Sequence, residues 1–182
     1  MSGRGAGSGG VPDPSAAPAL IRDVVPGDVP ALLEMFAELA DYEHLTHELR
    51  ATEQQLHAAL FGAHPAVEAL VAEQPGSGAT IGYAMFFPTF STFLASTGVW
   101  LEDLFVRPAH RRGGIGRMLL ATLAARMRAR GGERLEWAAL DWNEPALDFY
   151  RGLGARTMGE WITHRLTGDE LERLAGEGRA PR

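Results

Sequence analysis

A strand-like run, a glycine-rich turn and an amphipathic helix follow one another between residues 99 and 130. Val99–Val106 has the apolar character of a strand, and Ile115–Arg130 places apolar residues at helical spacing. The turn between them, Arg107–Gly116, holds three glycines, which allow a close approach between backbone and ligand. A strand that enters a helix through such a turn presents free N–H groups and the positive end of the helix dipole.

Arginines surround this turn and add formal positive charge: they are Arg107, Arg111, Arg112 and Arg117. With the helix N-terminus they predict a pyrophosphate site, and a tight turn with solvated arginines is the alternative. A Walker A loop is excluded because it requires a lysine and the chain has none. A dinucleotide fingerprint requires a Gly-x-Gly-x-x-Gly turn early in a βαβ unit, whereas this turn follows several strand-like runs.

The rest of the chain alternates between strand-like and helix-like segments. Strands are expected at 19–22, 68–73, 80–87, 134–140 and 155–166, and helices at 28–42, 52–61, 145–153 and from 167. Asp28 and Thr52 are the expected N-caps of the first two helices, and Pro88–Gly98 is expected to be a loop. The order of the elements predicts an α/β (α+β) fold with a mixed sheet.

Composition suggests where the folded part lies. Residues 1–18 are rich in Gly, Pro and Ser and are expected to form a disordered tail, and 176–182 a flexible end. Residues 19–175 contain enough apolar side chains for the core of a single domain. No apolar stretch approaches the about 18–20 residues of a membrane span, and no signal peptide is visible. A cytoplasmic protein without a membrane partner is therefore expected.

Charge and side-chain chemistry argue against several functions. The net charge of −6 argues against general nucleic-acid binding. The absence of cysteine excludes disulfides, a thiol nucleophile and cysteine-ligated metals, and the six histidines lack metal-ligand spacing, so no metal is expected. Acidic residues greatly outnumber arginines in residues 1–100, which favours a cationic small molecule as partner.

Two motifs together carry a resemblance to a known family. The spacing Arg111-x-x-Gly114-x-Gly116 is identified as the acyl-CoA signature of the GNAT superfamily of N-acetyltransferases. The segment from Asp141 to Ala155 resembles a second GNAT motif, which places a tyrosine seven residues after an asparagine. Within the superfamily, Trp100–Val106, Trp142–Pro145 and Ala37–Glu43 are similar to the spermidine/spermine (diamine) acetyltransferases.

The resemblance implies the GNAT fold, a central mixed and mostly antiparallel sheet flanked by helices. It also implies transfer of acetyl from acetyl-CoA to a primary amine of a small cationic acceptor: a polyamine, a diamine or an amino-acid-like amine. Two alternatives stay open: acetylation of a peptide or protein amine, and a non-catalytic module that binds acyl-CoA. The Phe- and Thr-rich stretch Phe87–Gly98 departs from the diamine enzymes and leaves polyamine specificity open.

The resemblance also implies catalytic roles. Tyr150 is the candidate acid for the leaving thiolate, and a core tyrosine beside Phe149 and Leu153 is the alternative. Glu102 is the candidate base that removes the amine proton through water, and a structural ion pair is the alternative role for this residue. Strand alternation predicts that Glu102 and Asp103 face opposite sides of the sheet.

Binding roles are implied for further residues. By resemblance, the acetyl-CoA contacts are Leu104, Phe105, Val106, Arg111, Arg112, Gly113, Gly114, Ile115, Gly116, Arg117, Asn143, Pro145 and Tyr150. The acceptor contacts are Tyr42, Glu43, Glu102 and Asp103. The resemblance also implies a homodimer, with the last strand or its neighbouring loops at the contact.

Overall fold

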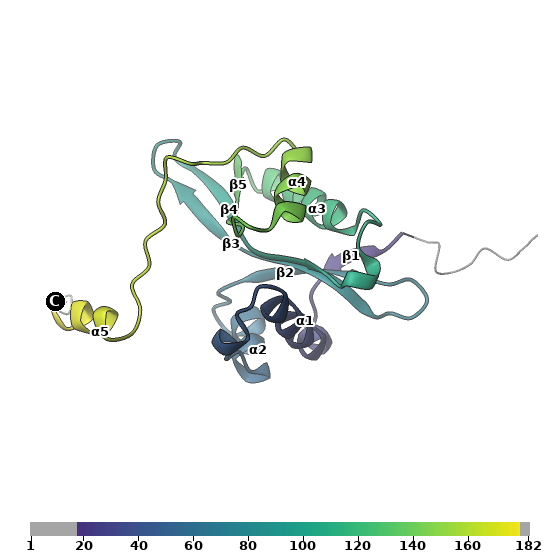
Figure 1. Ribbon diagram of the computed structural model, residues 1–182, viewed down its shortest axis with the longest axis horizontal. Helices are drawn as coiled ribbons and strands as arrows, with labels where there is room; N and C mark the ends of the chain where they lie inside the picture. Colours follow the sequence, from purple (N-terminus) through teal and green to yellow (C-terminus); the bar gives the residue numbers. More distant parts are fainter. Residues whose placement is uncertain (1–17, 179–182) are drawn as a thin grey trace, which may run out of the picture. The chain divides into compact units, whose positions relative to one another are not determined.

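A five-stranded sheet lies at the centre of the larger of two units into which the computed structural model divides after Ala138 (Figure 1). The structure describes residues 18–178, so the predicted tail lies almost entirely outside the described residues, as does most of the predicted flexible end. The strand order is β1-β2-β3-β4-β5. The strands are β1 (Leu20–Asp23), β2 (Glu68–Glu73), β3 (Thr80–Ser91), β4 (Ser96–Val106) and β5 (Arg134–Glu136).

The sheet is mixed and mostly antiparallel, as expected. Neighbouring strands from β1 to β4 pair antiparallel, and β5 pairs parallel to β4. The β3–β4 hairpin is longer than predicted, because pairing continues to Ser91 and Ser96 and turns most of the expected loop Pro88–Gly98 into strand. Its threonines and phenylalanines favour strand pairing. Phe93 at the tip is 95% exposed.

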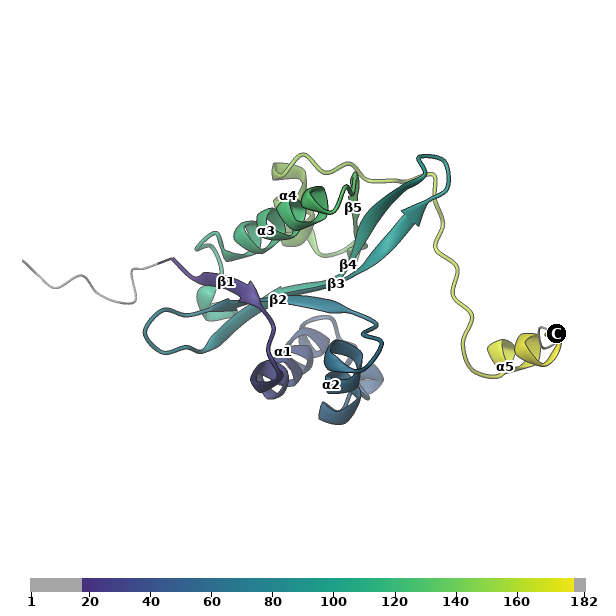
Figure 2. The same cartoon turned by 180° about the vertical axis from the view of Figure 1, so that it is seen from behind.

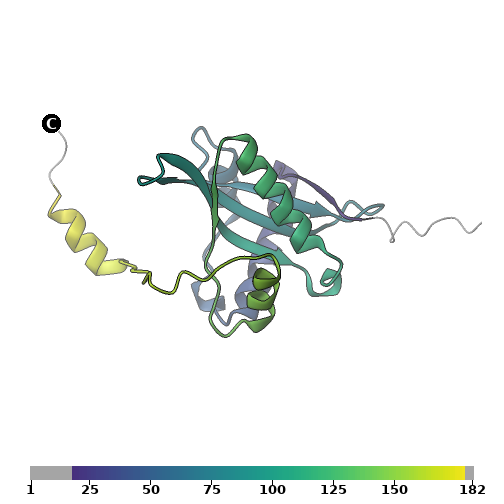
Figure 3. The ribbon, with the colours of Figure 1, turned by 90° about the horizontal axis from the view of Figure 1, so that it is seen from above.

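Helices cover both faces of this sheet (Figure 2). On one face lie α1 (Val29–Tyr42) and α2 (Glu53–Phe61), and on the other lies α3 (Ile115–Ala129), which crosses the strands in Figure 3. Helix α1 buries Leu32 and Met35 in one apolar cluster with residues of β2, β3 and β4. The N-cap predicted at Thr52 is confirmed and forms a capping box with Gln55. Short 3-10 helices η2 (Pro26–Asp28), η3 (Thr46–Glu48) and η4 (Pro108–His110) lie in the connections.

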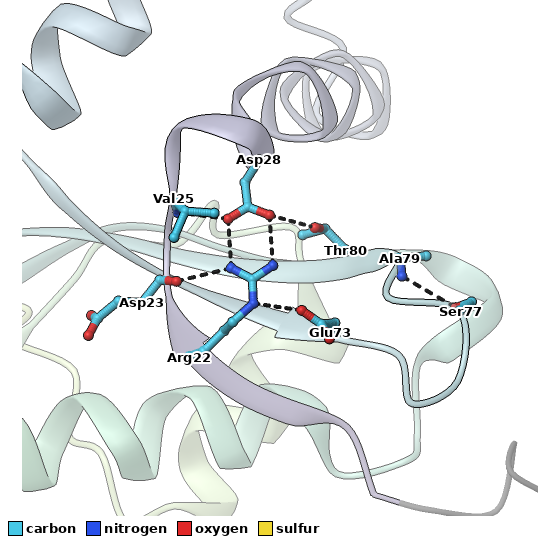
Figure 4. Close-up of polar contacts among 8 residues, drawn as sticks. All are labelled: Arg22, Asp23, Val25, Asp28, Glu73, Ser77, Ala79 and Thr80. Carbon is cyan, nitrogen blue, oxygen red and sulfur yellow. Dashed lines mark hydrogen bonds and ion pairs between the residues drawn. The ribbon is translucent and has the colours of Figure 1, made fainter.

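An ion-pair network joins the first strand to the start of α1 (Figure 4). The Arg22 guanidinium donates to both carboxylate oxygens of Asp28, at 2.7 and 2.9 Å, and to Glu73 at 2.6 Å. Thr80 also donates to Asp28, which is buried. Asp28 occupies the predicted N-cap position, but its side chain does not cap α1, because Arg22 and the amide of Val25 take its oxygens instead.

The smaller unit, residues 139–178, contains α4 (Glu144–Gly152) and α5 (Gly168–Gly176). The strand predicted at 155–166 is wrong: this segment forms no strand, because the unit offers no other strand for its backbone to pair with. Its apolar side chains are exposed, Trp161 at 73% and Ile162 at 79%. The predicted strand 134–140 is also shorter, since β5 ends at Glu136.

No helix in residues 18–178 has the length and apolar character that crossing a membrane would require.

Candidate functional site

The end of β4 has an open edge on the side of β5. The two strands pair only where Gly98–Trp100 meets Arg134–Glu136, so within the described chain no strand pairs with Leu101–Val106 on that side. The expected cofactor residues Leu104, Phe105 and Val106 lie on this part of β4. An extended ligand arm can form strand-like hydrogen bonds with such an edge.

The glycine-rich turn that follows β4 leads into α3 as expected. Gly114 is the N-cap residue of α3 with φ of 80°, a conformation that favours glycine, and Arg112 also has a positive φ of 66°. The first turn of α3 has no side-chain cap and no acidic residue. A Cβ built on Gly114 would meet no atom within 4 Å. The turn therefore offers N–H groups and open space, the conditions that an anionic group needs.

The arginines of this turn differ in their surroundings. Arg111 donates from Nε to the carbonyl oxygen of Val106 at 2.8 Å, and its guanidinium carbon lies 5.3 Å from the ring centre of Tyr42 and 5.5 Å from that of Phe105. Arg111 thus joins the turn to the end of α1. Arg112 and Arg117 are exposed.

A β-bulge in β4 determines where its two acids point. Met85 pairs with Asp103 and the next residue of β3, Phe86, pairs with Leu101, so Glu102 is the extra residue. Asp103 therefore lies on the face of Met85, which packs against α1 and α2.

Glu102 shares this face with Asp103. Its carboxylate accepts a hydrogen bond from Nε1 of Trp100 at 3.0 Å, and Trp100 pairs with Phe87, two residues beyond Met85 on β3. The expectation that the two acids face opposite sides is wrong, because the bulge interrupts the alternation of the strand.

The two neighbouring carboxylates have different environments. Burial, assisted by the charges of Glu102 and Glu43, raises the pKa of Asp103 to about 6, although a hydrogen bond from the hydroxyl of Tyr83 at 3.3 Å opposes the rise. Burial also raises the pKa of Glu43, which follows the last residue of α1. Glu102 is exposed.

The larger unit thus brings together residues that are far apart in the sequence. Glu43 at the end of α1 and Glu102 lie within electrostatic range of Asp103, and Arg111 extends from the glycine-rich turn to Tyr42, the neighbour of Glu43. The sequence analysis missed Tyr83 and named Trp100 only as part of a family motif. Both lie in ordinary strand patterns, where only the hydrogen-bond partner reveals a polar role.

Helix α4 of the smaller unit carries the other expected site residues. The side-chain oxygen of Asn143 accepts from the amide of Ala146 at 3.3 Å and so caps the helix, and Pro145 lies in the first turn, where proline is well tolerated. The ring of Tyr150 lies 5.3 Å from that of Phe149. Asn143 therefore has a local structural role within its motif.

Comparisons with known proteins identify the family. Residues 29–155 match the model of the acetyltransferase (GNAT) family. The chain belongs to this family. Membership in this family makes the chain an N-acetyltransferase. GNAT enzymes use acetyl-CoA as the acetyl donor.

Individual relatives extend this result. Thialysine N-epsilon-acetyltransferase of Sus scrofa is 35% identical, with 88% of this chain and 99% of the relative covered. L-ornithine N5-acetyltransferase of Arabidopsis thaliana is 30% identical, over 85% of this chain and 86% of the relative. An integron cassette protein from the mobile metagenome of V. cholerae has a similar structure, with a TM-score of 0.73 and 29% identity over 88% of this chain and 99% of that one.

Proposed function

We propose that this GNAT acetyltransferase transfers acetyl to a primary amine of a small cationic acceptor: a polyamine, a diamine or an amino-acid-like amine. One observation carries the proposal: the β4 bulge turns Glu102 and Asp103 to one face, and Asp103 lies within electrostatic reach of both Glu102 and Glu43. Three neighbouring carboxylates attract an ammonium group, and an amine must lose a proton before it can attack a thioester. Relatives named for thialysine and ornithine, both of which carry two amino groups, support this acceptor class.

Acetyl-CoA, the cosubstrate of the family, fits the residues present. The uncapped start of α3 and the open space at Gly114 suit its pyrophosphate, and the unpaired edge of β4 at Leu104–Val106 suits its extended arm. When bound, it supplies an acetyl group activated as a thioester. The residues that would hold it are Leu104, Phe105, Val106, Arg111, Arg112, Gly113, Gly114, Ile115, Gly116, Arg117, Asn143, Pro145 and Tyr150.

The two catalytic roles fall to Glu102 and Tyr150. Glu102 is exposed and held by the indole N–H of Trp100, so it can accept the amine proton through water and pass it to solvent. Tyr150 supplies a proton to the departing thiolate. Tyr42, Glu43 and Asp103 bind the acceptor.

The test is a panel of amines with acetyl-CoA, in which release of free thiol is followed. The panel contains L-ornithine, thialysine, spermidine, putrescine, an aminoglycoside and a short peptide with a free N-terminus. We expect turnover with the small acceptors that carry two or more ammonium groups, and the same assay with Tyr150→Phe should show a strongly reduced kcat. Turnover with the peptide alone would replace the proposal by peptide acetylation. Binding of acetyl-CoA without turnover of any amine would indicate a non-catalytic acyl-CoA-binding module.

Residues 19–175 act as one GNAT domain in this proposal. The family match over 29–155 supports this because it runs across the division at Ala138. The acetyl donor is an intracellular metabolite, which favours the cytoplasm. Neither a metal nor a nucleic acid or membrane partner is required, and within residues 18–178 no cluster of metal-ligating side chains occurs.

The protein is proposed to act as a homodimer. Exposed apolar side chains of the segment 155–166, Met158, Trp161, Ile162 and Leu166, support an interface with a second copy. Light scattering at micromolar concentration should give twice the chain mass of 19.6 kDa, and Trp161→Glu with Ile162→Glu should give one chain mass. A single chain mass for the unmodified protein would contradict the dimer.

A further inference from the structure

Tyr83 of β3 places a hydroxyl group beside an otherwise apolar cluster. The residue is fully buried, and its ring packs against Phe36 of α1 at 5.3 Å and Phe105 of β4 at 6.3 Å between ring centres. A phenylalanine would fill the same space without a polar atom. A buried phenol needs a hydrogen-bond partner, and here the partner is Oδ2 of Asp103 at 3.3 Å.

The hydrogen bond from Tyr83 acts on Asp103, which must be charged to attract the ammonium group of the proposed acceptor. Asp103 lies among apolar residues, and in the described chain no arginine forms an ion pair with it. The hydroxyl of Tyr83 donates to the carboxylate and therefore favours the charged form of Asp103 over the neutral form.

We propose that Tyr83 is a positioning residue for acceptor binding: its hydroxyl orients Asp103 and keeps it ionised to receive the acceptor ammonium. The inference rests on the proposed function, since it takes Asp103 as an acceptor residue. Tyr83 does not itself contact the reacting atoms.

The other groups around Asp103 set the direction of the pH effect. Glu102 on β4 and Glu43 at the end of α1 both raise the pKa of Asp103, while Arg111 lies over the neighbouring ring of Phe105. Tyr83 is the group that opposes these acids. Loss of its hydroxyl therefore raises the pKa of Asp103 further, so Asp103 becomes protonated at a higher pH.

The experiment compares the unmodified protein with Tyr83→Phe in two independent readouts. With L-ornithine and thialysine as acceptors, Tyr83→Phe should raise the amine KM about tenfold, the size expected for one hydrogen bond to a charged group, with kcat and the acetyl-CoA KM within twofold. The acidic limb of kcat/KM should move up by roughly one pH unit. Carbon NMR of labelled aspartate should show the same rise in the pKa of Asp103 without any substrate.

Two further variants separate positioning from packing. Phe36→Leu weakens the ring packing around Tyr83 and keeps the hydroxyl, so it should lower the Tm and leave the pH profile unmoved. In an Asp103→Asn background, Tyr83→Phe should change the amine KM less than twofold, because the two residues act through one hydrogen bond.

An active enzyme whose amine KM and Asp103 pKa are unchanged by Tyr83→Phe would overturn the inference and leave the proposed function intact. Failure of the unmodified protein to acetylate any amine would overturn both the proposed function and the acceptor role of Tyr83. The NMR titration would then report only whether the hydroxyl tunes Asp103.

Discussion

Two acidic clusters of the larger unit are built in opposite ways. In the network of Figure 4, Asp28 and Glu73 share the guanidinium of Arg22. Burial alone would raise the pKa of Asp28, but the hydrogen bonds from Arg22 and Val25 hold that pKa below its ordinary value. At the bulge of β4, Asp103 is half-buried near two other acids, and its pKa is raised to about 6.

We interpret the first cluster as structural and the second as the proposed acceptor site. The first cluster carries its own cation, so its charges are satisfied when the chain folds, and removal of one partner would leave a buried charge unpaired. The second cluster lacks such a cation and keeps a potential that an incoming ammonium group can neutralise. Unpaired acids that remain in a fold despite their desolvation are candidates for ligand binding.

The largest expected effect is on catalysis at the second cluster. Glu102→Gln keeps the size of the side chain and removes the base, so kcat should fall about 10²–10⁴-fold with little change in the acetyl-CoA KM. The measurement is steady-state kinetics with L-ornithine over a range of pH. A kcat within threefold of the unmodified enzyme, with chemistry shown to be rate-limiting, would remove Glu102 from the mechanism.

The next effect is on stability at the first cluster. Arg22→Met leaves the buried Asp28 without its cation and should lower the free energy of unfolding by about 3 kcal/mol, measured by urea denaturation. Adding Asp28→Asn should restore part of the loss, because it removes the unpaired charge. The amine KM of the folded variant should stay unchanged. A raised amine KM in Arg22→Met with an unchanged free energy of unfolding would contradict the structural role of the first cluster.

The two clusters should also respond oppositely to pH. The pKa of Asp103 is raised from 3.8 to about 6, so the folded state binds this proton more tightly and loses that stabilisation as pH rises from about 4 to above 6. Asp103→Asn removes this loss. As pH rises from 4 to 7, the free energy of unfolding of this variant should increase by about 1–2 kcal/mol relative to that of the unmodified protein.

Asp28→Asn provides the control of opposite sign. Because the pKa of Asp28 is lowered, its carboxylate stabilises the fold above its unfolded-state pKa and loses that contribution as pH falls through the folded-state pKa. This variant should therefore lose stability relative to the unmodified protein as pH rises from about 3 to 7. Thermal unfolding across this range measures both variants, and slopes of the same sign would refute the contrast.

The smallest effect is expected at the rim of the first cluster. Glu73→Gln retains a hydrogen-bond acceptor for Arg22, and both side chains are about a quarter exposed. The free energy of unfolding should fall by only about 0.5–1 kcal/mol, with no change in kinetics. A loss as large as that of Arg22→Met would mean that Glu73, not Asp28, is the main partner.

Local patterns predicted most of the elements because the physical cause of each is local. The apolar stripe of α3 and the capping box at Thr52 depend on residues within one or two turns. The segment 155–166 shows the limit of such patterns. Its composition favours a strand, but a strand forms only where another strand supplies hydrogen-bond partners.

The sequence by itself determined the family, the glycine-rich turn and the identity of the acids proposed for the acceptor site, because each is a matter of residue type and spacing. The tertiary structure decided how those acids are arranged. A single extra residue in β4, visible only in its pairing with β3, turns Glu102 and Asp103 toward the same face. Burial, the end of α1 and the hydroxyl of Tyr83 then set the charge of Asp103. These effects depend on distances between residues remote in the chain, which no local pattern encodes.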